Sequence, residues 1–282
     1  MNYVVGYVKI KSNWFDIVGR GSKNVYEKIG KYEGLNLYFQ LYKFKLFNQE
    51  YADMFITSIS LLRKETGYSS MRIFGLLKSM KSAKVIKVSN VSRWEYLLDE
   101  NGNVKDKEVL IICACDLPCT ERKEKLDVNG NVVLDGDGHA IIIDKPITKD
   151  DYFIPVSLGM IDKYKSVDMY GTSNGKKVDK YVAMYCLIMK WSNNLESKVN
   201  MRIEKIADIL GIDKDYLHKM VYSMNRYYFM LSTRRVRKVA KGYMFEHFIC
   251  KSDVKYNTFV EVNKDKCDKL VSRYDSGKVK LG

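Results

Sequence analysis

The chain has 282 residues, and 48 Lys and Arg against 34 Asp and Glu give it a formal net charge of +14. Hydrophobic residues make up 46% of the chain, which is enough to build cores and excludes a wholly disordered protein. Uninterrupted apolar runs such as residues 109–115 are far shorter than the roughly 18 residues of a membrane helix. The positive balance therefore favours a polyanionic partner, nucleic acid ahead of an anionic membrane surface.

Cellular location is indicated by the cysteines and by the first residues of the chain. No charged stretch followed by an apolar core opens the sequence, so a secretory signal is not expected. Without such a signal, six Cys in a chain of this length indicate reduced thiols and a cytoplasmic protein, with no membrane partner.

The first half of the chain predicts a strand, three helices and two further strands. Residues 7–10 have the pattern of a short opening strand, and Leu37, Leu41 and Phe44 mark an amphipathic helix. A short helix from Ile59 follows, and then a second helix whose apolar residues recur at i, i+3, i+4 and i+7: Ile73, Leu76, Leu77 and Met80. Strands are predicted at residues 84–88 and 109–115, joined by a long loop.

Two Asn-Gly turns predict hairpins around the middle of the chain. The first, in residues 99–104, would be the tip of the loop between the two strands. The second, in residues 127–132, is expected to form an extra hairpin together with residues 132–134 and 140–143.

Two segments, one in each half of the chain, align without a gap at an offset of 144 residues, and the elements around them recur in the same order. A strand is predicted at residues 152–155, an amphipathic helix around Tyr181 and Tyr185, and strands at residues 228–231 and 243–250. Between them, the helix from Ile203 aligns with that from Ile59. The buried stripe of the next helix recurs at Leu217, Met220, Val221 and Met224.

Each copy has the punctuation of a helix-turn-helix. Gly67 and Gly211 stand where the first helix must end in a left-handed residue, which glycine adopts without strain. Ser69 and Asp213 follow two residues later and are suited to cap the next helix. Three helices followed by a two-stranded hairpin form the winged version of this motif.

We therefore predict an α+β protein with two tandem winged helix-turn-helix domains joined by a short linker that contains a β-hairpin. The expected boundaries are residues 1–116 for the first domain, 117–150 for the linker and 151–250 for the second domain. Residues 251–282 are expected to hold a short packed element and a basic tail.

The second helix of each copy is the first candidate binding site. Its outward residues supply donors for base edges and phosphates, as a helix in a major groove requires. They are Ser69, Ser70, Arg72 and Lys78 in the first copy, and Lys214, Tyr216, His218, Lys219 and Tyr222 in the second. The same faces could instead be ordinary solvated surface or contact another protein.

The second candidate site is the wing of the second domain. Five cations fall within residues 234–242, at the predicted hairpin tip: Arg234, Arg235, Arg237, Lys238 and Lys241. Such a tip can follow the DNA backbone or enter a narrow minor groove, and its binding would depend steeply on salt. The alternative is a solvated charge run that protects a strand edge.

Metal binding and catalysis are weakly supported. Cys113, Cys115 and Cys119 lie close together, but zinc needs a fourth ligand that the sequence does not supply, so buried free thiols are the favoured interpretation and no cofactor is expected. Asp127, Asn129 and Asn131 begin like a calcium loop, yet position twelve is Gly138 instead of Glu. With no catalytic cluster evident, an enzyme is not expected.

The segments "LLRKETGYSSMRIFGLLKSMKSAKVIKV" and "KVDKYVAMYCLIMKWSNN…IEKIADILGIDKDYLHKMVYSM" resemble the winged domains of plasmid and phage replication initiators and of DnaD-type replication proteins of low-GC bacteria. The resemblance covers residues 1–250 as an architecture. It implies binding of double-stranded DNA at repeated origin sequences and recruitment of host replication proteins. A plasmid or phage transcription regulator of the same fold is the alternative, and a protein that uses its winged helices to bind partners is a third possibility.

Overall fold

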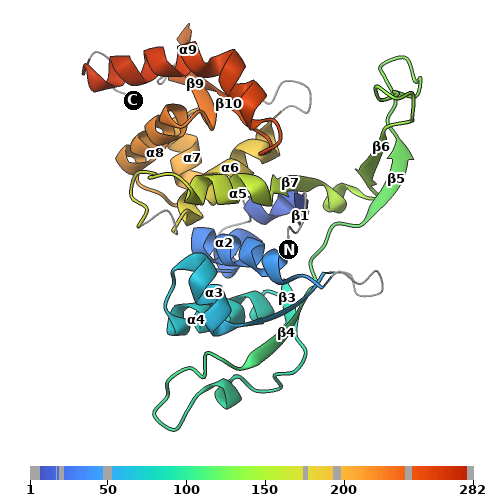
Figure 1. Cartoon of the computed structure of the whole chain (residues 1–282), viewed down its shortest axis with the longest axis vertical. Helices are drawn as coiled ribbons and strands as arrows, with labels where there is room; N and C mark the ends of the chain where they lie inside the picture. The colour runs from blue at the N-terminus through green and yellow to red at the C-terminus, as the bar shows by residue number, and fades with distance from the viewer. Residues whose placement is uncertain are drawn as a thin grey trace.

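The computed structural model describes residues 7–16, 18, 22–46, 53–173, 177–192, 198–238 and 243–277, with only the backbone described at residues 198, 234–238, 243 and 244. The described chain is mixed α and β, with small sheets of two or three strands. Figure 1 shows two helical bodies, one above the other, with a narrow two-stranded arm projecting from their junction.

The first body holds one three-stranded sheet and four α-helices. It begins with β1 (Tyr7–Lys11), the 3-10 turn η1 (Ser12–Phe15), α1 (Val25–Lys28), α2 (Lys31–Leu41) and η2 (Tyr42–Phe44). Then follow β2 (Met54–Ser58), α3 (Ile59–Thr66), α4 (Ser70–Ser82), β3 (Ile86–Val88), η3 (Trp94–Leu97) and β4 (Val109–Ala114). The sheet order is β2-β4-β3, with antiparallel neighbours.

The second body has the same order of elements and one additional long helix. It contains β7 (Phe153–Ser157), α5 (Leu158–Lys165), α6 (Asp179–Trp191), β8 (Lys198–Met201), α7 (Ile203–Leu210) and α8 (Lys214–Arg226). β9 (Met230–Lys238), β10 (Tyr243–Ile249) and α9 (Tyr256–Asp275) complete it, and the sheet order is β8-β10-β9. In both bodies the strand before the helix pair adds to the returning strand of the hairpin.

The repeat in the sequence is a repeat in the backbone. Both ends of α3 and α7, and both ends of α4 and α8, are separated by the same 144 residues. Gly67 and Gly211 end α3 and α7 with φ of 72° and 64°, and the side chains of Ser69 and Asp213 accept the capping hydrogen bonds of α4 and α8. The predicted helices, turns and caps are confirmed.

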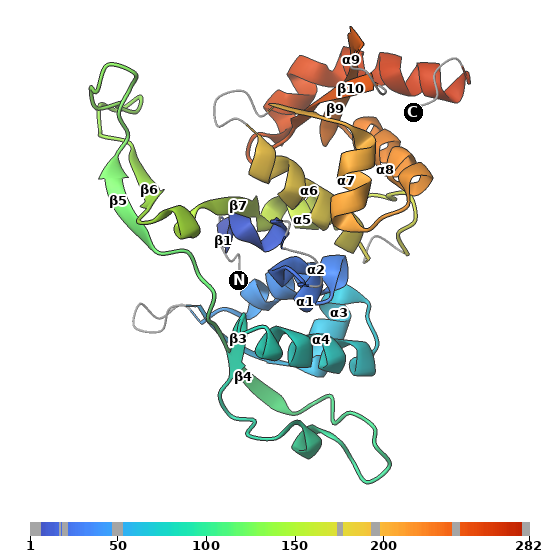
Figure 2. The same cartoon turned by 180° about the vertical axis from the view of Figure 1, so that it is seen from behind.

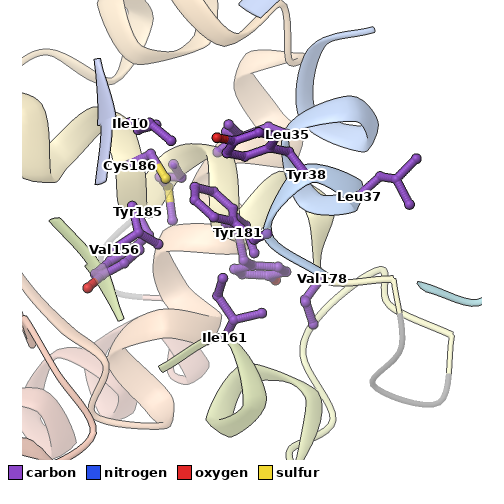
Figure 3. Close-up of a cluster of buried hydrophobic side chains, with 14 of the residues drawn as sticks. Ile10, Leu35, Leu37, Tyr38, Val156, Ile161, Val178, Tyr181, Tyr185 and Cys186 are labelled. Carbon is purple, nitrogen blue, oxygen red and sulfur yellow. The ribbon is translucent and has the colours of Figure 1, made fainter. Parts of the chain in front are cut away.

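The two bodies contact each other through equivalent elements. β1 and β7, the strands that open each copy, pair antiparallel from Tyr7 opposite Ser157 to Lys11 opposite Phe153. Helix α2 packs against its counterpart α6. Figure 3 shows the side chains of this junction, with Tyr38 of α2 near Tyr181 of α6, and with Ile10 and Val156 on the paired strands β1 and β7. Equivalent elements in contact are the mark of a local two-fold relation, as in a symmetric dimer.

Burial and polar contacts hold the two bodies in one orientation. Their buried apolar side chains form one continuous core. Lys165, at the end of α5, donates hydrogen bonds of 2.8 Å to the Gln40 side chain of α2 and to the Glu65 carbonyl of α3. The Tyr26 hydroxyl of α1 donates to the Leu210 carbonyl at the end of α7. Buried bonds of this kind resist sliding of one body on the other.

The linker forms the projecting arm seen in Figures 1 and 2. β5 (Thr120–Glu124) and β6 (Ile142–Pro146) make its ladder, followed by the short 3-10 turn η4 (Lys149–Asp151). The predicted hairpin is therefore present, but residues 134 and 140 contribute only an isolated bridge. The ladder is longer than predicted and lies nearer the base of the arm, because two similar turns occupy the residues at the tip. In these turns Asp127 and Asp135 each accept hydrogen bonds from the backbone N–H groups two and four residues later.

The interval from residue 251 differs from its prediction. In place of a short element and a basic tail, it contains α9, a 20-residue helix that packs on α8 and β9. Its inner side chains include Tyr256, Phe259 and the buried Cys267. Polar residues and charged residues of both signs hold most of the remaining positions, so the apolar stripe is thin and the sequence resembles a solvated tail.

Candidate nucleic-acid interface

Helix α4 presents a cationic face to solvent. Its apolar stripe, including Ile73, Leu76 and Met80, is buried as predicted. The opposite face exposes Arg72, Gly75 and Lys78, and the helix contains three cations and no carboxylate. A helix with this distribution brings positive charge to any surface on which it docks.

The predicted residues of α4 are held by neighbours from the same body. Arg72 forms an ion pair with Glu33 of α2, and its Nε donates to the same carboxylate at 2.8 Å. The Ser70 hydroxyl donates to Asp106, in the loop before β4, at 3.4 Å. Exposed ion pairs contribute little to stability and are easily exchanged, so Arg72 can leave Glu33 for a stronger acceptor. Ser69 is exposed and caps the helix, and Lys78 lies over the Phe74 ring, 5.4 Å from its centroid.

Helix α8 presents a different face, in which aromatic rings alternate with cations. Lys214 pairs with Glu204 of α7 at 2.9 Å, and Lys219 is exposed above the ring of Tyr170. Tyr216 is half-buried against Tyr170, with ring centroids 5.4 Å apart. Tyr222 is also half-buried, because α9 flanks it.

His218 is wrongly predicted as an outward residue. The structure buries it, and neither ring nitrogen has a hydrogen-bond partner among the described residues. It shares one flank of α8 with Asn225, seven residues later, which is buried and accepts a hydrogen bond from the Ser232 N–H of β9. Burial, followed by the charge of Lys214, lowers the pKa of His218, so the ring is neutral near pH 7. His218 therefore belongs to the packed side of the helix.

The predicted basic wing is described only in part. Arg234, Arg235, Arg237 and Lys238 lie on β9, whose backbone pairs with β10 and has a register shift between Tyr243 and Met244. Their side chains and Lys241 lie outside the described residues.

Two exposed arginines escaped the prediction. Arg226 ends α8, and Arg63 on α3 pairs with Asp106 at 2.8 Å. Arg226 stands four residues after Tyr222, so extending the outward stripe of α8 by one turn would have included it. Arg63 lies on the first helix of its pair, whereas the prediction concerned the outward residues of the second helix.

The cysteine cluster shows no metal site. The prediction that these thiols are buried is wrong: Cys113 lies on β4 and is half-buried, while Cys115 and Cys119 are exposed because they lie at and beyond the end of the strand. Within the described ranges, no three His, Cys, Asp or Glu side chains are grouped so that they could hold a metal ion.

None of the described helices is both long enough and apolar enough to cross a membrane. Comparison of the chain with models of protein families and with curated proteins finds no match.

Proposed function

We propose that the chain is a sequence-specific double-stranded DNA-binding protein built from two tandem winged helix-turn-helix domains, and that it serves as a replication initiator of a plasmid or phage. The carrying observation is the exact recurrence of one helix pair at an interval of 144 residues, each time with cations on the outer face of its second helix. The order helix, strand, helix pair and hairpin in both bodies supports this proposal, because it matches the order of elements expected of a winged helix.

The contact between the bodies supports a particular kind of target. Equivalent strands β1 and β7 pair antiparallel, which relates α4 and α8 by a local two-fold. Two heads in this relation engage inverted half-sites whose centres lie about 34 Å apart or a multiple of it. The outward residues of α4 and α8 differ, so the two half-sites differ in sequence.

Initiation at repeated origin sites would also require host replication proteins as partners, and we place the protein in the cytoplasm with reduced cysteines. We assign it no catalytic activity and no cofactor. A plasmid or phage transcription regulator is the second candidate, favoured by one feature: α9 is a long C-terminal helix, the kind of element through which such a regulator dimerises.

The experiment compares Arg72→Ala with Arg122→Ala. Both remove one exposed arginine, but Arg122 lies on the arm strand β5. DNA fragments that the parent selects from a genomic library serve as the cognate ligand, and scrambled duplexes serve as the reference. Arg72→Ala should reduce discrimination by on the order of 1–3 kcal/mol, while Arg122→Ala should leave it unchanged.

Equal discrimination by the two variants and the parent would contradict DNA reading by α4. The selected fragments also separate the two candidates. Tandem repeats beside an AT-rich region support initiation, whereas a single operator that overlaps a promoter supports regulation.

A further inference from the structure

A small pocket lies beside α8, between that helix and residues 168–172. Three tyrosine rings line it, from Tyr170, Tyr222 and Tyr227, together with Ser223, Arg226 and Asp168. Its volume is about 320 Å³, at the lower end of the range of ligand pockets. Tyr170 is 42% exposed, so one ring of the pocket is accessible from solvent.

Hydrogen bonds and stacking fix the rings in place. The Tyr222 hydroxyl donates to Asp275 of α9 at 2.6 Å, and its ring stacks on Tyr274 with centroids 4.3 Å apart. The Tyr227 hydroxyl donates to the Asp168 carbonyl at 2.9 Å. Because these contacts use the hydroxyls of Tyr222 and Tyr227, what these two rings can still offer a ligand is mainly aromatic surface. Rings that are already ordered lose little entropy when a planar ligand stacks on them.

Charges around the pocket determine which part of a ligand would lie inside it and which part would lie at its edge. Lys219 lies 5.4 Å from the Tyr170 centroid, and its hydrogen bond with the Tyr170 side chain raises the pKa of the amine, which keeps it cationic. Arg226 is exposed at the edge. The Asp168 carboxylate repels phosphate and can accept a hydrogen bond from an exocyclic amine. An aromatic base is thus favoured inside the pocket, with its phosphates outside near the two cations.

We propose that this pocket binds an unpaired nucleobase of a single-stranded nucleic acid. Bases in a duplex stack on each other and offer only their edges in the grooves, so a recessed ring can stack only on a base that has left the helix. Aromatic side chains interleaved with cations are the general means by which proteins hold single strands. The outward face of α4, with Arg72, Gly75 and Lys78, contains no tyrosine, so this mode belongs to the second body.

The inference deepens the proposed function, on which it rests, by adding a single-strand ligand at the surface of the second head. Its test uses the full chain, a fluorescent single strand of about 15 nucleotides and a duplex of the same sequence, measured by fluorescence anisotropy. Tyr170→Leu removes the ring and keeps apolar bulk, and Tyr170→Phe is its matched control. Tyr170 lies outside α8, so neither variant replaces a duplex-reading residue, although the Tyr170 ring packs on Tyr216 and lies under Lys219.

The proposal predicts that Tyr170→Leu binds the single strand about five-fold or more weakly than the parent, that Tyr170→Phe retains most of the affinity, and that Tyr170→Leu loses less duplex affinity than single-strand affinity. Tyr222→Leu, whose ring lies on the other element of the pocket, should show the same single-strand loss. Thermal melting of each variant verifies its folding.

Two results would overturn the proposal: no single-strand binding by a parent that binds duplex, or equal binding by the Leu and Phe variants. The first of these leaves duplex reading intact. Conversely, a parent that binds the single strand through Tyr170 but shows no preference among duplexes would contradict the proposed function and retain the pocket. If the parent binds duplex but not the single strand, and a protein partner protects Tyr170, the pocket binds a peptide instead.

Discussion

Asp179 should make the protein less stable at neutral pH than its packing alone would allow. This residue opens α6 at the junction between the two bodies, and it is buried. Burial, with a smaller contribution from the nearby Glu33 carboxylate, raises the pKa of the carboxyl from 3.8 to about 6. The hydrogen bond of 3.0 Å from the Lys180 N–H opposes the shift without cancelling it.

The direction and size of the effect follow from proton linkage. The folded state binds this proton more tightly than the unfolded state, so the carboxyl carries no penalty below pH 3.8. The free energy of unfolding then falls as the pH rises toward 6. The difference between 3.8 and about 6 corresponds to about 3 kcal/mol at pH 7.

Asp179→Asn removes the charge and keeps a side-chain oxygen that can accept the Lys180 N–H. Urea unfolding, followed by circular dichroism from pH 4 to 7.5, should show the variant gaining up to about 3 kcal/mol over the parent at pH 7 and almost nothing at pH 4. Asp208→Asn, at an exposed position of α7, is the control and should show no such pH-dependent gain. A gain that is independent of pH, or a variant less stable than the parent at pH 7, would refute the reasoning.

Three further predictions concern the cores. Leu76→Ala, at a side chain buried between α4 and the first core, should lower the free energy of unfolding by about 2–5 kcal/mol, whereas Leu61→Ala at an exposed position of α3 should change it by less than about 1 kcal/mol in thermal or urea melts. Gly34→Ala should destabilise by about 3 kcal/mol or more, because its Cβ would lie 1.9 Å from the Ile29 carbonyl oxygen, while Gly75→Ala in open space should stabilise by about 0.5–1 kcal/mol; similar melting of these two variants would contradict the packing of α2. Burial lowers the pKa of His247 from 6.5 to about 4, so the stabilisation from the neutral ring is fully present above pH 6.5 and is lost as the pH falls toward 4. The difference in the free energy of unfolding between the parent and His247→Asn, measured by urea unfolding, should therefore narrow in acid. A difference that does not change with pH would refute this prediction.

Local signals in the sequence were sufficient for the helix pairs. A left-handed glycine, a capping side chain and a stripe of four apolar residues act within one or two helical turns, so Gly67, Ser69 and their counterparts at Gly211 and Asp213 could be placed without knowledge of the rest of the chain. The Asn-Gly turns at Gly102 and Gly130, both with positive φ, are local in the same way.

Tertiary contacts were beyond the same reasoning. The residues of β1 do not predict that it pairs with β7, because pairing between strands so far apart in the sequence depends on how the two bodies pack. The half-burial of Tyr216 and Tyr222 depends on the loop at Tyr170 and on α9, and both dock from elsewhere in the chain. The outward residues of α8 could thus be predicted from their spacing, but the pocket lined by Tyr170, Tyr222 and Tyr227 could not.

Hydroxyl-radical footprinting of the full chain on a duplex selected from a genomic library tests the central claim most directly. Two reading heads predict two protected segments, with centres about 34 Å or a multiple of it apart along the duplex. Arg72→Ala should weaken protection of one segment, and Lys219→Ala should weaken the other. A single protected segment, or uniform weak protection that disappears at modest salt, would contradict a duplicated DNA-reading unit.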